Sequence, residues 1–94
     1  MTSESLRIEL RPTLSHCVES AAKEEYESSL GKYLWAHGHD KSLQERLELV
    51  LAFLQSVDFR QLRCESEKHL VEGKDVRFVL YMEEGEPRYE MHVG

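Results

Sequence analysis

Residues 75–93 contain two runs in which apolar and polar side chains alternate, and this stretch restricts the fold more than any other. Every second position in both runs is apolar: Val76, Phe78, Leu80 and Met82, then Tyr89, Met91 and Val93. Alternation of this kind, rich in β-branched and aromatic residues, predicts strands. Between the runs, Gly85 can adopt the positive φ of a tight turn, and Pro87, which lacks an N–H, fits the start of a strand. The stretch therefore predicts a β-hairpin.

Two turn lengths, a two-residue loop at Glu84 and Gly85 or a four-residue loop over residues 83–86, give the same strand register. The facing pairs on the apolar side are Leu80 with Tyr89, Phe78 with Met91 and Val76 with Val93. A slip by one residue would turn the apolar set of one strand outward, so the agreement of the two runs predicts this register.

The other face of the predicted hairpin is mixed. Its facing pairs are Tyr81 with Arg88, Val79 with Glu90 and Arg77 with His92. We expect this face to be half solvated. Its candidate contact residues for a protein partner or a second copy are Val79, Tyr81, Arg88 and His92. In the alternative interpretation they are ordinary surface residues, because scattered exposed apolar side chains are common.

Residues 5–11 alternate Leu6, Ile8 and Leu10 with charged side chains. A helix is the competing interpretation, because leucines also recur four positions apart. Pro12 favours a strand, since a proline pushes the preceding residue toward extended backbone. A third strand would also support the hairpin, which is marginally stable alone.

Apolar residues spaced three and four apart predict three helices between the first strand and the hairpin. Their expected ranges are residues 13–36, 42–55 and 58–73. Ser42 and Glu45 have the spacing of a capping box, and Asp58 can cap the third helix. Gly31 is an alternative end for the first helix. The second helix is apolar nearly all round, so we expect it to be the most buried.

These elements predict an α+β fold of order β-α-α-α-β-β over a single small domain, residues 1–94. An N-terminal strand and the C-terminal hairpin would form a short antiparallel sheet packed against two or three helices. The predicted core contains Val18, Ala22, Tyr26, Leu30, Leu34, Leu47, Val50, Leu51, Leu54, Leu62, Leu70, Phe78, Leu80, Tyr89 and Met91.

Composition narrows the expected partners. The net charge of −6 disfavours binding to nucleic acid or to an anionic membrane. No apolar run approaches the roughly 18–20 residues that span a bilayer, and the first residues lack the features of a signal peptide. Cys17 and Cys64 have neither CxxC spacing nor disulfide-scaffold density, so we expect two reduced thiols in a cytoplasmic protein.

Two groups of residues invite a chemical interpretation. His37, His39 and Asp40 share one loop and are types that ligate zinc, although a polar loop after a helix needs no metal. Cys17 lies near a helix start, which lowers a thiol pKa, yet it also suits a small core position. No complete catalytic set is visible, and no cofactor is predicted.

The expected function is therefore a small non-enzymatic interaction module that binds a protein partner or itself through the sheet. One alternative is a winged-helix-like DNA-binding regulator, because three helices precede a hairpin and the third carries Arg60, Arg63 and Lys68. The acidic turn and the glutamates of that helix oppose phosphate binding. A second alternative is a metal-binding protein that uses residues 37–40.

Overall fold

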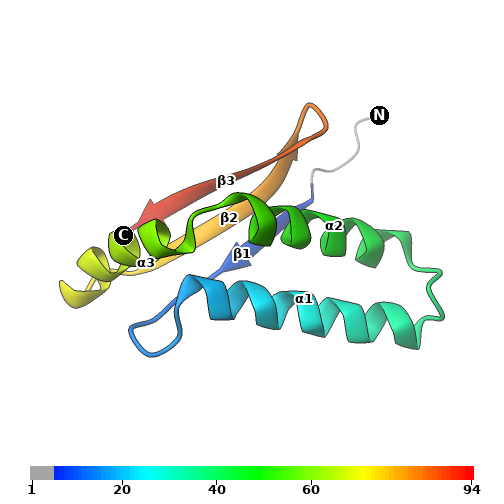
Figure 1. Ribbon diagram of the computed structural model, residues 1–94, viewed down its shortest axis with the longest axis horizontal. Coiled ribbons are helices and arrows are strands. Elements are labelled where there is room, and N and C mark those ends of the chain that lie inside the picture. Colours follow the sequence, from blue (N-terminus) through cyan, green and yellow to red (C-terminus); the bar gives the residue numbers. More distant parts are fainter. Residues whose placement is uncertain (1–5) are drawn as a thin grey trace.

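The computed structural model describes residues 6–94, and its elements follow the order β-α-α-α-β-β. The strands are β1 (Arg7–Leu10), β2 (Val76–Glu83) and β3 (Glu86–Val93), and the helices are α1 (Val18–Trp35), α2 (Lys41–Ser56) and α3 (Phe59–Val71). The strands form one antiparallel sheet with β2 in the centre. In Figure 1, α1 and α2 run antiparallel beside the sheet and α3 lies near its end. The predicted α+β fold is confirmed.

The hairpin has the predicted register. Leu80 pairs with Tyr89, and Phe78 pairs with Met91. The two-residue loop is the one that forms, with φ of 53° at Glu84 and 80° at Gly85. Two consecutive positive φ angles are typical of the turn whose twist matches that of the flanking strands.

Of the predicted strand over residues 5–11, residues 7–10 form a strand, residues 6 and 11 do not, and residue 5 lies outside the described residues. Ile8 faces Leu80 and Leu10 faces Phe78 across the β1–β2 ladder. Ile8 and Leu10 are both fully buried, so the alternation in this segment reflects one face toward the core and one toward solvent.

The first helix is shorter than predicted, because the chain first reverses direction. The backbones of Thr13 and His16 exchange hydrogen bonds of 2.8 and 3.2 Å, which close a tight turn between β1 and α1. Cys17 is extended and serves as the N-cap residue, so α1 begins at Val18. At its other end the helix passes through Gly31 and ends only at Trp35, so Gly31 is not the end of the helix.

The second helix is capped by Asp40 and not by Ser42. The Asp40 carboxylate accepts a hydrogen bond from the Leu43 N–H at 3.1 Å, so the helix begins two residues earlier than the capping-box pattern indicates. Asp58 caps α3 as predicted, because its carboxylate accepts hydrogen bonds from the N–H groups of Arg60 and Gln61.

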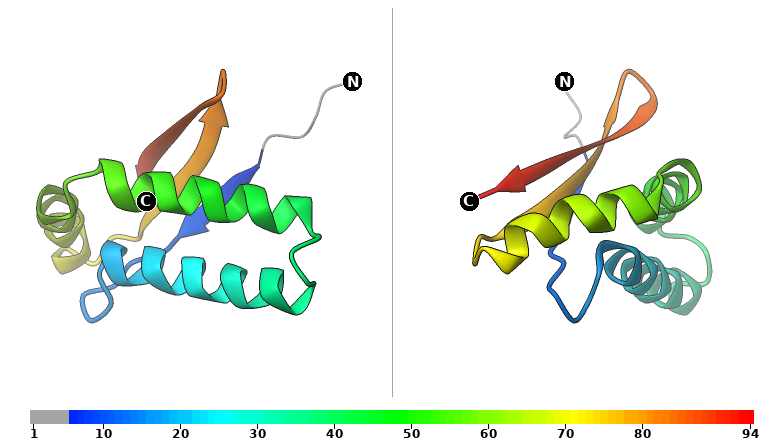
Figure 2. Two further views of the ribbon diagram at one scale, coloured as in Figure 1. Left: turned by 45° about the vertical axis from the view of Figure 1, so that its right-hand side comes forward. Right: turned by 60° about the vertical axis from the view of Figure 1, so that its left-hand side comes forward.

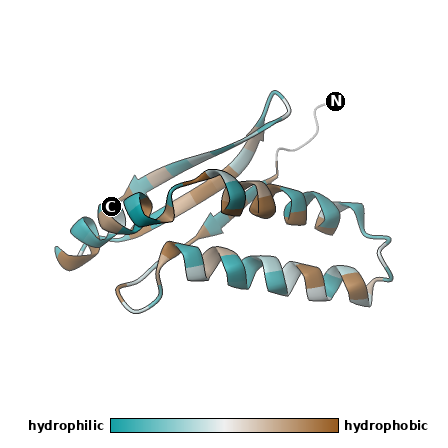
Figure 3. Ribbon diagram, in the orientation of Figure 1, coloured by the Kyte–Doolittle hydropathy of each residue, from teal (hydrophilic) through white to brown (hydrophobic). Residues whose placement is uncertain are grey.

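The core lies between the helices and the sheet, and Figure 3 shows hydrophobic positions recurring along β2 and along both long helices. Its buried members come from every element except β3: Ile8, Leu10, Val18, Ala22, Leu49, Val50, Phe53, Leu62, Val76, Phe78 and Leu80. Because β2 is flanked by both other strands and covered on one side by α2, its inward residues Phe78 and Leu80 are completely buried, whereas Met82 near the turn is 40% exposed. An ion pair of 2.8 Å between Arg46 of α2 and Glu25 of α1 joins the two helices beside this core.

The predicted core is correct in the middle of the molecule and wrong at its margins. Seven of its members are buried: Val18, Ala22, Leu47, Val50, Leu62, Phe78 and Leu80. Five are half-buried: Tyr26, Leu30, Leu54, Leu70 and Met91. Leu34, Leu51 and Tyr89 are 63%, 38% and 41% exposed. Leu34 is in the last turn of α1, and the far ends of α1 and α2 project past the sheet in Figure 1, so the sheet does not cover it.

Candidate functional site

The helices cover one face of the sheet and leave the other open, and the left view of Figure 2 shows all three strands behind the helices. Its side chains occupy the positions that alternate with the buried ones. We call this surface the outer face; it comprises Arg7, Glu9, Arg77, Val79, Tyr81, Arg88, Glu90 and His92. The four residues predicted from the sequence, Val79, Tyr81, Arg88 and His92, all belong to it.

Tyr81 is at the centre of the outer face. Its hydroxyl donates a hydrogen bond of 3.1 Å to Glu90, and the Arg7 guanidinium lies 5.3 Å from the centre of its ring. Desolvation and the hydrogen bond to Glu90 raise the pKa of Tyr81. The same Glu90 carboxylate lies 3.1 Å from the His92 imidazole, so Tyr81, Glu90 and His92 form a connected group.

A second connected group surrounds Glu9 of β1. Its carboxylate accepts hydrogen bonds from Arg77 at 2.8 Å and from Arg11 at 3.1 Å. These charge-assisted bonds lower the pKa of Glu9, with Arg77 contributing most. The outer face therefore carries an ordered set of polar side chains around two half-buried residues, Val79 and Tyr81.

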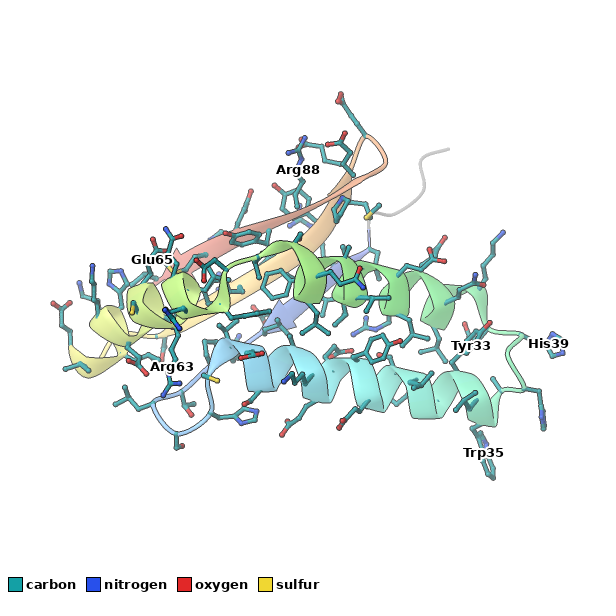
Figure 4. All side chains as sticks on the ribbon, in the orientation of Figure 1. Tyr33, Trp35, His39, Arg63, Glu65 and Arg88 are labelled. Carbon is teal, nitrogen blue, oxygen red and sulfur yellow. The ribbon has the colours of Figure 1, made fainter. Side chains whose placement is uncertain are left out.

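Arg88 is set apart from the other three predicted residues. Its guanidinium lies 3.2 Å from Glu86 and 3.6 Å from Glu83, on either side of the turn. Figure 4 shows Arg88 near the tip of the hairpin. Although Arg88 faces Tyr81 in the register, its charge is directed to the acidic turn.

The free edge of β3 is the part of the sheet that sequence reasoning described least well. In residues 6–94, β3 has β2 as its only strand neighbour, and none of its eight residues is buried. Tyr89 and Val93 point toward the helix side yet stay 41% and 38% exposed. The sequence signal for an edge was Pro87, because prolines inside sheets are confined to edges and strand starts.

One aromatic cluster attaches β3 to the helices. The rings of Tyr89 and Phe53 meet edge to face with their centres 5.4 Å apart, and Phe53 meets Phe59 of α3 in the same way at 5.5 Å. Tyr89 also lies 6.3 Å from Phe78 of β2. Phe53 was not predicted to be in the core, although it joins three elements there.

The loop with the two histidines does not gather further metal ligands. His37 and His39 are exposed, and Figure 4 shows His39 pointing away from the body of the protein. Asp40 is engaged as the cap of α2. Over residues 6–94, no group of three or more His, Cys, Asp or Glu side chains is arranged to hold a metal ion.

The two cysteines are free and lie on different elements, Cys17 at the start of α1 and Cys64 in α3. Cys17 is half-buried at the start of α1, where its sulfur lies 3.4 Å from the Ser20 hydroxyl. Hydrogen bonds from the Ser20 side chain and backbone lower the pKa of Cys17. Cys64 is exposed on α3. Among the hydrogen bonds of the described chain, none joins Cys17 to a basic side chain. These contacts therefore do not form a nucleophile–base pair.

The cationic side chains of α3 are partly neutralised. Arg63 donates a hydrogen bond of 3.0 Å to Glu67, and this contact raises the pKa of Arg63. Figure 4 shows Arg63 and Glu65 on different sides of the helix. Helix α3 therefore presents both signs of charge and no continuous basic stripe.

A further exposed apolar group lies at the end of α1 and was not recognised from the sequence. Trp35 is 87% exposed beside the exposed Leu34, and Figure 4 shows its ring projecting outward from the helix end. The helical pattern placed Leu34 in the predicted core and did not include Trp35, and the length of α1 relative to the sheet explains why both are exposed. In residues 6–94, no helix is both long enough and apolar enough to cross a membrane.

Comparison with known proteins identifies a relative and a family, and neither comes with a described activity. A protein of Archaeoglobus fulgidus with the name "Uncharacterized protein" is 42% identical over 50 residues, which cover 51% of this chain and 59% of that protein. The match thus spans less than two thirds of the relative's length. No solved structure matches the chain. A protein-family model matches residues 5–91, and the chain belongs to that family.

Proposed function

We propose that this protein is a small non-enzymatic interaction module that binds a protein partner, or a second copy, through its sheet. The observation that carries the proposal is the state of β3, an eight-residue edge strand with no buried residue and with exposed apolar side chains. An unpaired strand edge offers backbone groups to an added strand, and neighbouring side chains give selectivity.

The outer face supports the same proposal. Val79 and Tyr81 supply a half-buried apolar centre, and ion pairs and hydrogen bonds link the arginines and carboxylates around it. Ordered polar side chains around an apolar centre are typical of protein contact surfaces, where the rim is polar. The two free cysteines agree with a reducing compartment, and we propose a cytoplasmic location.

The alternative functions have weaker support from the same geometry. A DNA-binding regulator would need a basic recognition surface, whereas Arg63 is paired with Glu67 and the hairpin tip carries Glu83, Glu84 and Glu86. A metal-binding function would need a third ligand beside His37 and His39, since Asp40 caps α2.

The experiment uses one substitution on the edge and one on the outer face. Met91→Pro removes an edge N–H, and Met91→Leu is its control because it keeps that N–H at similar side-chain volume. Val79→Ser tests the outer face, and Val71→Ser, on the exposed end of α3, is its control. Circular dichroism establishes that each variant is folded.

We expect the proline and Val79→Ser variants to lose binding or self-association in pull-down and sedimentation measurements, while both controls retain it. Binding that is equal in all four folded variants would exclude the sheet as the contact surface.

A further inference from the structure

The alternation of hydrogen-bonded and non-bonded pairs along the hairpin identifies which backbone groups of β3 are free. Asp75 and Gly94 exchange hydrogen bonds of 2.9 and 3.0 Å, one pair beyond Val76 and Val93 at the open end of the hairpin. Antiparallel pairs alternate between bonded and non-bonded, so Arg88, Glu90 and His92 bond to β2. The N–H and C=O groups of Tyr89, Met91 and Val93 therefore point to the open edge.

A second copy can add its own β3 to this edge in three central registers, and the sequence separates them. A pair centred on Tyr89 places Pro87 opposite Met91, and two hydrogen bonds are lost because proline has no N–H. A pair centred on Glu90 sets two carboxylates directly opposite each other, which is destabilising. A pair centred on Met91 has neither defect.

In the Met91-centred register, the free N–H and C=O groups of Tyr89, Met91 and Val93 all gain partners. Met91 pairs with Met91 of the second copy, and Tyr89 pairs with its Val93, so Pro87 lies outside the paired segment. On the helix side, Tyr89 and Val93 cover each other at the place where both are exposed in the single chain. On the outer face, Glu90 of each copy lies opposite His92 of the other.

We infer that the protein forms a two-fold symmetric dimer in which β3 pairs antiparallel with β3 of a second copy, centred on Met91. This inference rests on the proposed function and names its partner. Self-complementarity favours a second copy, because a carboxylate and an imidazole placed symmetrically about Met91 face each other when the same strand returns in the opposite direction.

The net charge of −6 per chain opposes the association of two copies, but this term is weak. At physiological ionic strength, exposed charges farther apart than roughly 8 Å are largely screened. In the segment that pairs, from Arg88 to Val93, the formal charges of Arg88 and Glu90 cancel.

The first measurement is backbone amide hydrogen exchange of the wild-type protein at low and high concentration, together with sedimentation equilibrium. We expect the amides of Tyr89, Met91 and Val93 to become protected as the dimer forms. The amides of Glu90 and His92 are the internal control, because they bond to β2 in both states.

The second measurement is a charge complementation. Glu90→Arg sets cations against His92 of the other copy, and His92→Glu sets carboxylates against its Glu90, so each variant should self-associate about tenfold more weakly. When the two variants are mixed, every facing pair is attractive, and we expect a heterodimer. Arg88→Gln is the control. Arg88 faces Gly94 of the other copy in this register, and it faces Glu90 only in the Tyr89-centred one.

Several results would overturn the inference. They are a dimer whose Tyr89, Met91 and Val93 amides exchange freely, a mixture that does not restore association, and a wild type that is monomeric at about 0.5 mM. If the wild type is monomeric and Met91→Pro abolishes binding of another protein, the second copy is the wrong occupant and the edge is still the contact site. If neither Met91→Pro nor Val79→Ser changes the result of either assay, the proposed function fails as well.

Discussion

Replacing Phe53 by alanine tests whether one side chain holds the helices to the hairpin. Phe53 is 4% exposed and meets both Phe59 and Tyr89 edge to face. Truncating a buried phenylalanine costs about 3–5 kcal/mol, from lost burial and from the cavity that remains. A 94-residue domain has about 5–14 kcal/mol of stability in total, so the variant should be folded but close to its limit.

Leu51→Ala is the matched control, since it truncates a residue of the same helix that is 38% exposed. It should cost about 1 kcal/mol, because part of the leucine is already in water. In urea denaturation with m of about 1.5 kcal/mol per molar, Phe53→Ala should lower the midpoint by about 2–3 M and the control by less than ~1 M. An unchanged m would indicate that the unfolded state is not altered.

A double-mutant cycle with Tyr89→Ala isolates the contact between α2 and β3. We expect a coupling free energy of about 0.5–1.5 kcal/mol, the value typical of aromatic pairs. The reasoning is refuted if Phe53→Ala costs no more than Leu51→Ala, or if the effects of Phe53→Ala and Tyr89→Ala simply add. Either result would mean that α2 does not pack on the hairpin through these rings.

Three further predictions concern single groups. Asp58→Ala should lower the free energy of unfolding by about 0.5–2 kcal/mol, measured in urea, whereas Asp58→Asn should keep most of the cap. Because Arg77 lowers the pKa of Glu9, the stability from this pair is present above the ordinary glutamate pKa and is lost as the pH falls through the folded value. Denaturation at a series of acidic pH values should show this loss in the wild type and not in Glu9→Gln. The alkylation rate of Cys17 should rise with a midpoint below the ordinary thiol pKa, and Ser20→Ala should move that midpoint upward.

The hairpin and its register could be predicted because they depend on local information. The alternation on both sides of Glu84 and Gly85 sets the inward face, and a one-residue slip is penalised at every position. Pro12 settled the first strand in the same local way. Such local patterns can be interpreted without knowing which elements pack against these strands.

The depth of burial could not be predicted, because it depends on the lengths of elements relative to one another. Leu34 has the same helical spacing as Ala22, yet α1 continues beyond the sheet and leaves Leu34 in water. In α2, apolar residues surround the whole helix, so the sequence could not distinguish Phe53, which is buried, from Leu51, which is exposed. Orientation of a helix without a clear polar face is decided by tertiary packing.

For the candidate site, the sequence identified the outer-face residues and not their grouping. The register alone placed Tyr81 opposite Arg88, whereas the structure links Tyr81 to Glu90 and sends Arg88 to the turn. Long side chains reach diagonal neighbours on a sheet, and the choice among them depends on local charges that pairwise spacing does not reveal.

The asymmetry of the sheet is what connects its fold to the proposed function. β1 and most of β2 bury their inward side chains, while β3 is held by the ladder to β2, by the aromatic contact of Tyr89 with α2 and by Met91, which packs against the core. A strand attached in this way retains exposed apolar area and a full row of free backbone groups, both of which a pairing strand would cover. Pro87 blocks pairing at only one end of β3. The open segment from Tyr89 to Val93 is therefore where association would cover the most exposed apolar area and free backbone groups.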